Sequence, residues 1–300
     1  MENRLIVKDN HLIESKGHLT IYEHKILAWC VAKLDKNDIN FNVCELTRKE
    51  AILLLGFPEN ISIKRISDLI GGMYGKCIEI RDPKKSDDYH RFGLITSDGY
   101  SSKTQTFSIK ISDDLKPFLL QLRANFTKLD LIEILRFKRS HTAKFYEICK
   151  KELMGMNEAY FERDMSEFKD FLGLKDNYKK YKDLKKWVFA PSIKELKEIA
   201  GLKVTITPSR YHSREYKKLF FDVEVLDLKK SGVWFQLSSF GLTEEQIHDI
   251  FKKYSNNEIR VALKKYGAQI GSGHFDNGTK INSKAAVFRA KLKSISERKE

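Results

Sequence analysis

The chain has 300 residues, and its 55 Lys and Arg against 41 Asp and Glu give a formal net charge of +14 at pH 7. This length predicts two domains, or two and an appendage, and a hydrophobic content of 41% is enough for ordinary cores. The longest apolar run, at 51–57, is far shorter than the ~18 residues of a membrane span, and no signal-peptide core follows the N-terminus. We therefore expect a folded cytoplasmic protein without membrane contact.

The four cysteines stand far apart in the sequence, at Cys30, Cys44, Cys77 and Cys149. None belongs to a Cys-x-x-Cys pair or to a Cys/His cluster with zinc spacing. We expect buried, reduced thiols, no metal site and no cofactor.

The positive charge is concentrated in the later parts of the chain. Residues 1–122 carry 18 basic and 17 acidic side chains, residues 123–230 carry 25 and 17, and residues 231–300 carry 12 and 7. The stretch 175–218 alone holds 13 basic and 5 acidic residues. This asymmetry predicts a polyanionic partner bound mainly by the later segments. A solvated lysine-rich surface would produce the same excess.

Periodicity and capping residues predict a winged helix in the first third of the chain. Helices are expected at 20–34, 47–56 and 62–71. Strands are expected at 39–43, 77–81, 90–96 and 104–111. Thr47 with Glu50 forms a capping box, and the turn residues 97–99 are expected to join the last two strands. Helix, short strand, two helices and a hairpin is the order of a winged helix.

The same order returns later in the chain. Helices are expected at 141–153, 165–172 and 178–199, and strands at 159–162, 202–207 and 219–226. Gly56 and Gly173 stand 117 positions apart, and this shift brings the two sets into register. We therefore predict an α+β protein with two tandem winged-helix domains, a pseudo-repeat of about 117 residues and a C-terminal helical tail. The predicted boundaries are 1–122, 123–230 and 231–300.

The connection and the tail add further expectations. Residues 113–131 are too hydrophobic for a free linker and should pack both halves into one body. Tail helices are predicted at 243–254, 257–266 and 283–296, with a Gly-rich break at 271–278. The last helix carries Lys284, Arg289, Lys291 and Lys293. These residues indicate either extra affinity for the polyanionic partner or a contact with another protein.

Short motifs in a specific order and spacing cover about residues 5–226. They are Val7–Asn10, Phe107–Ser112 with Leu115–Leu119, Leu129–Tyr146, and Tyr181–Leu196. Together they resemble the Rep initiator proteins of iteron-controlled, theta-replicating bacterial plasmids. Two departures are a weak match at Lys197–Ala200, where the family has Glu-Ile-Asn, and the tail after Ser231, which lies outside the common core.

The resemblance implies a DNA-binding origin initiator and not an enzyme. Such proteins bind direct repeats (iterons) in double-stranded DNA as monomers through both winged helices. They help to open an adjacent AT-rich region, where the host initiator and the replicative helicase are recruited. As a homodimer joined through the N-terminal domain, many bind an operator inverted repeat and repress their own promoter. The second winged helix makes most base contacts in the family.

A helical projection of 178–199 separates a core face from a free face. Leu184, Val188, Ser192, Leu196 and Ile199 share the side that we expect to be buried. A recognition helix presents its opposite face to the major groove. The predicted base contacts are Lys179, Asp183, Lys186 and, at the margin, Trp187, because lysine can donate to guanine and aspartate can accept from cytosine. Lys180, Lys182 and Lys185 are predicted to contact phosphates, and Pro191 is expected to kink the helix.

Three further basic groups are candidates for phosphate contacts. They are Arg210, His212 and Arg214 in the wing; Arg136, Lys138, Arg139 and Lys144 beside a helix start near Ser140; and Lys64 and Arg65 in the first domain. A solvated basic surface is the alternative for each group. On the first hairpin, Phe92, Leu94 and Ile95 are available for dimerisation unless they belong to the core.

Enzyme functions find little support in the sequence. The eight histidines contain no His-x-His pair of the kind that a rolling-circle nuclease needs. The segment 71–76 is similar to a phosphate loop, but it has one residue too few between glycines, and Cys77 stands where Ser or Thr is required. An ATPase, a nuclease and a single-strand or RNA binder are thus disfavoured. A winged-helix transcriptional repressor without an initiator role is the nearest alternative.

Overall fold

The computed structural model describes residues 5–34, 38, 41–81, 88–120, 122, 124–209, 216–275 and 280–297. The chain divides into two compact units. The first comprises Met1–Glu152, Phe161–Ala200 and Val204–Phe221, and the second comprises Leu153–Tyr160, Gly201–Lys203 and Asp222–Glu300. The domain boundaries expected from the sequence stay predictions.

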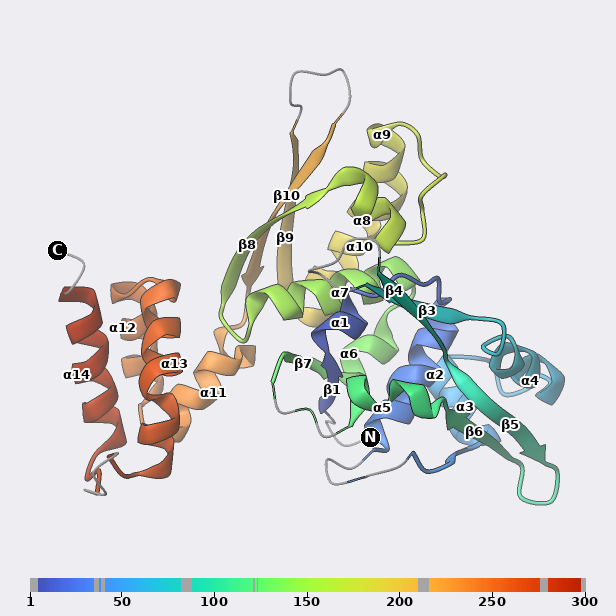
Figure 1. Ribbon diagram of the computed structural model, residues 1–300, viewed down its shortest axis with the longest axis horizontal. Coiled ribbons are helices and arrows are strands. Elements are labelled where there is room, and N and C mark those ends of the chain that lie inside the picture. Colours follow the sequence, from blue (N-terminus) through green and yellow to red (C-terminus); the bar gives the residue numbers. More distant parts are fainter. Residues whose placement is uncertain are drawn as a thin grey trace. The chain divides into compact units, whose positions relative to one another are not determined.

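The first winged helix lies in the first unit (Figure 1). Its elements are α2 (Ile21–Ala32), β2 (Cys44–Thr47), α3 (Arg48–Leu55), α4 (Ile63–Gly71), β5 (Ile95–Ser101) and β6 (Thr106–Ile111). Side chains cap all three helices, because Thr20, Thr47 and Ser62 each accept a hydrogen bond from the first helical turn. The strands form an antiparallel sheet in the order β2-β6-β5.

Three predictions in this domain are wrong. The strand expected at 90–96 is divided by a bend at Leu94 into β4 (Tyr89–Gly93) and the start of β5. Of the strand expected at 39–43, residues 39 and 40 lie outside the described residues, and 41–43 form no strand. The strand is β2 instead, where Cys44 and Leu46 are buried while Glu45 and Thr47 are exposed. The expected turn at 97–99 lies inside β5, because these residues pair with β6, and the hairpin turns at 102–105. Gln105 takes the left-handed conformation there, with a φ of 52°. Pairing with β6 fixes both β2 and β5, and neither the apolar alternation at 39–43 nor the turn residues at 97–99 reveal that partner.

The remaining elements of the first domain brace the winged helix. They are β1 (Leu5–Asp9), α1 (Asn10–Ile13), β3 (Cys77–Arg81), β4 (Tyr89–Gly93), the 3₁₀ turn η1 (Asp113–Leu115), α5 (Lys116–Leu119), β7 (Phe126–Asp130) and α6 (Leu131–Arg136). Strand β1 pairs with β7, and β3 pairs with β4. Leu115, Leu119 and Leu129 are buried, so the described parts of the connection at 113–131 are packed and do not form a free linker.

The first hairpin does not offer the apolar surface that we considered for dimerisation. Leu94 and Ile95 are buried, which agrees with the alternative that they belong to the core. Phe92 is half-buried, and its ring lies 5.4 Å from that of Phe118 on α5. Core packing accounts for all three side chains.

The second winged helix repeats the first. It contains α7 (Ser140–Leu153), β8 (Glu158–Asp164), α8 (Met165–Phe171), a helical run at Tyr181–Ala200, β9 (Leu202–Ser209) and β10 (Lys218–Val225), and its sheet has the order β8-β10-β9. Helices α3 and α8 begin 117 positions apart. Gly56 and Gly173 end them in the left-handed conformation, with φ of 70° and 72°, which glycine adopts without a steric penalty. The predicted register is therefore confirmed.

The second unit contains a helical bundle with its own core (Figure 1). Its helices are α11 (Gly232–Ser239), α12 (Glu244–Lys253), α13 (Asn256–Ser272) and α14 (Lys284–Ser296), after the 3₁₀ turn η4 (Leu228–Lys230). Trp234, Leu237 and Phe288 are buried together. The sequence did not predict α11, whose ends are the weak helix formers glycine and serine; burial of Trp234 and Leu237 stabilises it.

Two sequence expectations about the whole chain can be compared with the structure. All four cysteines are free thiols, and three are buried as predicted, but Cys77 is exposed. Within the described residues, no helix has both the length and the apolar character needed to cross a membrane.

Candidate nucleic-acid interface

The candidate recognition helix is a continuous helical run from Tyr181 to Ala200. It consists of α9 (Tyr181–Leu184), the π-helical turn η2 (Lys185–Phe189), α10 (Ala190–Glu195) and a second π-helical turn, η3 (Leu196–Ala200). It begins three residues later than predicted, after Tyr178, whose φ of 50° is incompatible with a helix. Pro191 has no N–H to donate, and the turn before it has π geometry, with the N–H of Ala190 bonded to the carbonyl of Lys185.

The two faces of this helix follow the predicted division. Leu184, Val188, Ser192 and Leu196 are buried, and Ile199 is half-buried. On the free face, Lys186 is exposed, Trp187 is 58% exposed, and Asp183 is half-buried. Lys179 is exposed but precedes the first helical residue, so its predicted place on a helical face is wrong. The ammonium of Lys186 lies 4.6 Å from the Trp187 ring centroid, so these side chains form a single cation–π unit. Lys180, Lys182 and Lys185 are also exposed.

Aromatic packing fixes the helix to the domain core. Phe189 is buried, and its ring centroid lies 5.7 Å from that of Phe145 on α7 and 6.3 Å from that of Phe168 on α8. At the start of the helix, the Tyr181 ring lies 4.8 Å from that of Tyr216, beside β10. Burial, together with the neighbouring Tyr216, raises the pKa of the Tyr181 hydroxyl. The free face is thus held on a rigid support.

The wing is the hairpin of β9 and β10. Its base is closed by a hydrogen bond of 3.1 Å from the N–H of Lys217 to the carbonyl of Ser209. Arg210, His212 and Arg214, which we predicted to contact DNA, lie outside the described residues. The exposed side chain of Lys217 stands at the same end of the hairpin and was not singled out from the sequence. The sequence could have indicated Lys217, because this residue lies in the basic stretch 175–218.

Comparison with known proteins assigns both winged helices to one family. The family described as "Initiator Replication protein, WH1" matches residues 5–150, and "Initiator Rep protein, WH2" matches residues 164–223. The chain belongs to this family of replication initiators. The resemblance that the motifs indicated is therefore confirmed, as is the fold class of two tandem winged helices.

Two relatives illustrate the relationship of this initiator to known proteins. A "Replication initiation protein" of Escherichia coli is 27% identical over 237 residues, which cover 75% of this chain and 71% of the relative. The solved structure titled "Crystal structure of Pi initiator protein in complex with iteron DNA" has a TM-score of 0.62 and 18% identity, and the match covers 75% of this chain and 98% of that chain. At this identity the second likeness establishes the shared fold.

The basic cluster at the start of the second domain is only partly available to a ligand in the initiator. Arg136, Lys138 and Arg139 are exposed, but the guanidinium of Arg139 forms an ion pair with Glu195 on α10. The backbone N–H of Lys138 also donates to Glu195, at 3.2 Å. These bonds link the segment before α7 to the recognition helix. Part of the positive charge of this segment therefore holds the helix in place.

Lys144 does not belong to this exposed cluster, which corrects the prediction. Its side chain is buried, and its ammonium donates to the carbonyls of Phe171, at 2.6 Å, and Ser15, at 3.3 Å. The residue lies on the inner face of α7, one helical turn from the start at Ser140, and therefore cannot meet a phosphate. Burial lowers the pKa of Lys144 to about 8.

This pKa predicts a pH dependence of stability. In the unfolded chain Lys144 has its ordinary pKa of 10.5, so between pH 8 and 10.5 the unfolded state binds more protons than the folded state. The free energy of unfolding should therefore rise with pH across this window. Relative to a Lys144→Met variant, we expect the initiator to gain up to roughly 3 kcal/mol, measured by urea denaturation at a series of pH values. A difference that does not change with pH would contradict the assignment.

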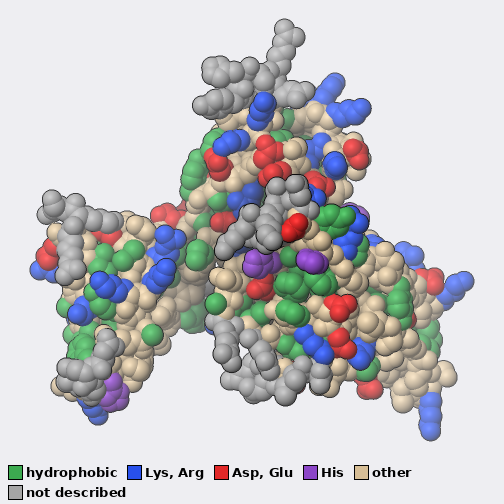
Figure 2. All heavy atoms as spheres, viewed as in Figure 1, with side chains coloured by type: hydrophobic (Ala, Val, Ile, Leu, Met, Phe, Trp, Pro, Cys, Tyr) green, Lys and Arg blue, Asp and Glu red, His purple; other side chains and the backbone are tan. Residues whose placement is uncertain are grey.

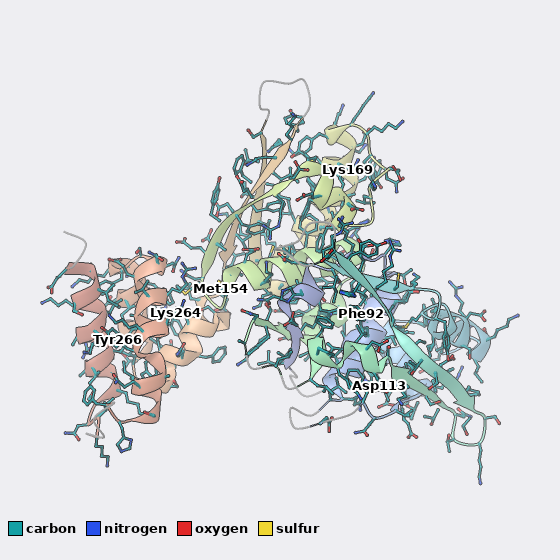
Figure 3. The ribbon with its side chains drawn as sticks, in the orientation of Figure 1. Phe92, Asp113, Met154, Lys169, Lys264 and Tyr266 are labelled. Atoms are coloured by element: carbon teal, nitrogen blue, oxygen red, sulfur yellow. The ribbon has the colours of Figure 1, made fainter. Side chains whose placement is uncertain are left out.

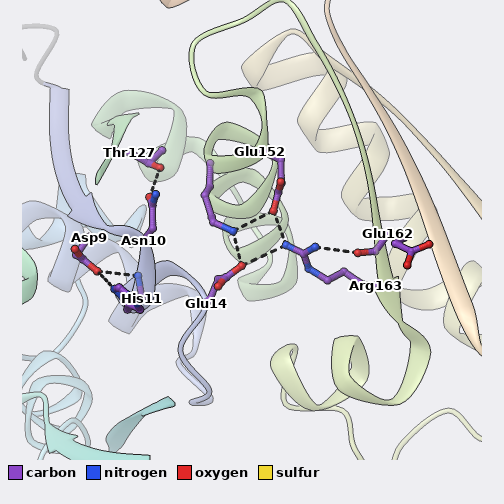
Figure 4. A network of polar contacts seen from close by, with 9 residues as sticks. Asp9, Asn10, His11, Glu14, Thr127, Glu152, Glu162 and Arg163 are labelled. Atoms are coloured by element: carbon purple, nitrogen blue, oxygen red, sulfur yellow. Dashed lines mark hydrogen bonds and ion pairs between the residues drawn. The ribbon is translucent and has the colours of Figure 1, made fainter. Parts of the chain in front are cut away.

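Polar contacts join the first domain to α7 and β8 (Figure 4). Glu14, which follows α1, pairs with Lys151 on α7 and Arg163 on β8, and Arg163 also pairs with Glu152. A buried ion pair of 2.6 Å joins Lys8 on β1 to Glu147 on α7. These contacts join α7 and the part of β8 in the first unit to the first domain.

In the first domain, α4 is the counterpart of the recognition helix. Lys64 and Arg65 are exposed in its first turn, behind the cap at Ser62. Asp68 is exposed one turn later, so this helix presents less positive charge than the second one. The geometry allows a secondary contact with DNA.

Proposed function

We propose that this chain is a plasmid replication initiator that binds iteron repeats at its origin and promotes origin opening. The observation that carries the proposal is the free face of the Tyr181–Ala200 helix, which presents Asp183, Lys186 and Trp187 on a second winged helix of an initiator family, with the exposed Lys179 just before its start. The relative solved in complex with iteron DNA supports the same ligand. Such a protein acts by binding double-stranded DNA, without a cofactor and without catalysis of its own.

Each exposed group has a distinct role in this proposal. Lys179, Asp183, Lys186 and Trp187 contact base edges in the major groove. Lys180, Lys182, Lys185 and the wing contact phosphates and set the register of the helix on the duplex, and Arg136, Lys138, Lys64 and Arg65 add secondary phosphate contacts. A homodimer represses the promoter, and the host initiator and helicase join the monomer at the opened origin. The protein performs these roles in the cytoplasm.

Base recognition predicts a selective loss of affinity. Lys186→Ala and Asp183→Ala should each weaken binding to the cognate repeat by about 1–3 kcal/mol and relax the base preference at one position. The measurement is fluorescence anisotropy at fixed salt, with the repeat that flanks the gene and a scrambled duplex. Unchanged affinity and preference in both variants would show that the recognition face is wrong.

The matched control is Lys180→Ala, which removes one exposed lysine at the start of the same helix. Because a phosphate contact carries no base information, this variant should weaken cognate and scrambled DNA alike and make the salt slope shallower by about 0.9. The initiator role itself is tested by replication of an origin-only plasmid when the chain is supplied in trans. Binding without replication would favour a plain repressor.

A further inference from the structure

The second unit concentrates positive charge on two of its helices. Helices α13 and α14 together carry seven Lys and Arg and one acidic residue, Glu258. The adjacent α12 carries three acidic and two basic residues, and α11 carries no charge. Figure 2 shows Lys and Arg side chains over the visible face of this bundle. The tail charge seen in the sequence is therefore localised on one helix pair.

The α13–α14 basic face has a defined geometry. Arg260, Lys264 and Lys265 are exposed on α13, and Arg289 and Lys293 are exposed on α14. Lys264 and Tyr266 can be located on α13 in Figure 3. The ammonium groups of Lys265 and of Lys291 on α14 lie 5.4 and 5.0 Å from the centroid of the same Tyr266 ring. Cations of both helices thus meet at one place.

In the described part of the second unit, few carboxylates compensate these cations. Among the described residues, Lys264, Lys265 and Arg289 form no ion pair, and the 3.6 Å contact of Lys293 with Glu297 is between exposed side chains. The one acidic residue of the two helices, Glu258, is held at the start of α13 by hydrogen bonds from the N–H and hydroxyl of Ser255. Like charges at this density repel one another unless a polyanion approaches.

We propose that the α13–α14 basic face binds the phosphate backbone of duplex DNA outside the repeat that the winged helices contact. The inference rests on the proposed function, which brings this chain to duplex DNA, and adds a third contact surface. With 17 residues, α13 is about 25 Å long and can follow the backbone over most of a DNA turn. Val261 is the one exposed large hydrophobic residue described on these helices, so the face lacks the apolar anchors of a protein interface.

The test uses the full chain and two matched pairs of exposed lysines. Lys264→Gln/Lys265→Gln removes two charges from α13, and Lys252→Gln/Lys253→Gln removes two from α12. The probes are a duplex that contains one repeat and no flanks, a duplex with roughly one helical turn of added random sequence on each side, and a random duplex of the same total length. Anisotropy titrations at several salt concentrations give the affinity and the salt slope.

We expect the α13 pair to bind the flanked and the random duplexes about tenfold more weakly, with a salt slope shallower by about 1.8. Its affinity for the duplex without flanks should stay within about twofold, and the α12 pair should bind all three probes like the parent chain. The proposal would be overturned if both double variants lost the same DNA affinity, or if the α13 double variant lost none. Loss of replication in trans with unchanged DNA affinity would assign the face to an acidic host protein.

The same titrations give a different result if the proposed iteron-binding function is wrong. If the chain is not an iteron-binding protein, the parent chain shows no preference for the repeat over a scrambled duplex of equal length. The random duplex still reports on the α13–α14 basic face in that case, because phosphate contacts are independent of sequence.

Discussion

Replacement of Glu147 by Gln is expected to lower the free energy of unfolding by about 3–5 kcal/mol. The carboxylate of Glu147 is paired with the ammonium of Lys8 at 2.6 Å, and both side chains are almost completely buried. The buried ammonium of Lys144 is also stabilised by the charge of Glu147. The amide leaves both ammonium groups uncompensated between β1 and α7, which is where the two winged helices meet. Urea denaturation at pH 7 measures the change.

An exposed ion pair of nearly the same length provides the control. Glu162 and Lys218 are 2.7 Å apart across β8 and β10, with both side chains about half exposed. Glu162→Gln should therefore cost less than about 1 kcal/mol. In a Lys8→Met/Glu147→Met double variant, most of the loss should be recovered, because no buried charge of the pair then remains. A similar small cost for both single variants would contradict the burial argument.

Truncation of Phe189 to Ala is expected to destabilise the chain by about 3–5 kcal/mol. The ring is fully enclosed by the aromatic side chains of α7, α8 and the start of the recognition helix. The cavity that remains would release the helix from its support, so affinity for the cognate repeat should fall more than affinity for scrambled DNA. Thermal or urea unfolding and the anisotropy assay give the two readouts.

Trp187, two positions earlier, is the natural comparison because its ring faces solvent. Trp187→Ala should change the stability by no more than about 0.5 kcal/mol while it weakens cognate DNA binding, through loss of the ring that holds Lys186. Phe189→Leu, which keeps most of the buried volume, should cost less than about 1.5 kcal/mol. The face assignment fails if Trp187→Ala destabilises the chain as strongly as Phe189→Ala.

Local signals predicted the helices well because they are carried by few residues. Thr47 with Glu50 formed the expected capping box, and Gly56 and Gly173 ended helices in both repeats. The projection of the recognition helix also located its buried side, since Leu184 and Val188 repeat at helical spacing and are buried. These features depend on neighbours within one or two turns.

The errors occurred where distant partners decide the structure. The strand at Cys44–Thr47 is defined by pairing with β6, more than fifty residues later, and no local pattern shows that partner. Lys144 occurs beside exposed basic residues in the sequence, but it lies on the inner face of α7, where carbonyls of Ser15 and Phe171 accept its protons. Charge composition alone cannot distinguish a buried lysine from a solvated one.

Gly56 and Gly173, the two left-handed glycines of the repeat, differ in how well their positions tolerate a substitution. A Cβ atom added at Gly56 would meet nothing within 4 Å, so asparagine, which tolerates this conformation better than most residues, is an acceptable replacement there. At Gly173 the same atom would lie 2.8 Å from Nδ1 of His18, a residue of the first domain. Homologues should therefore carry glycine or asparagine at position 56, whereas changes at position 173 should be accompanied by a smaller residue at position 18.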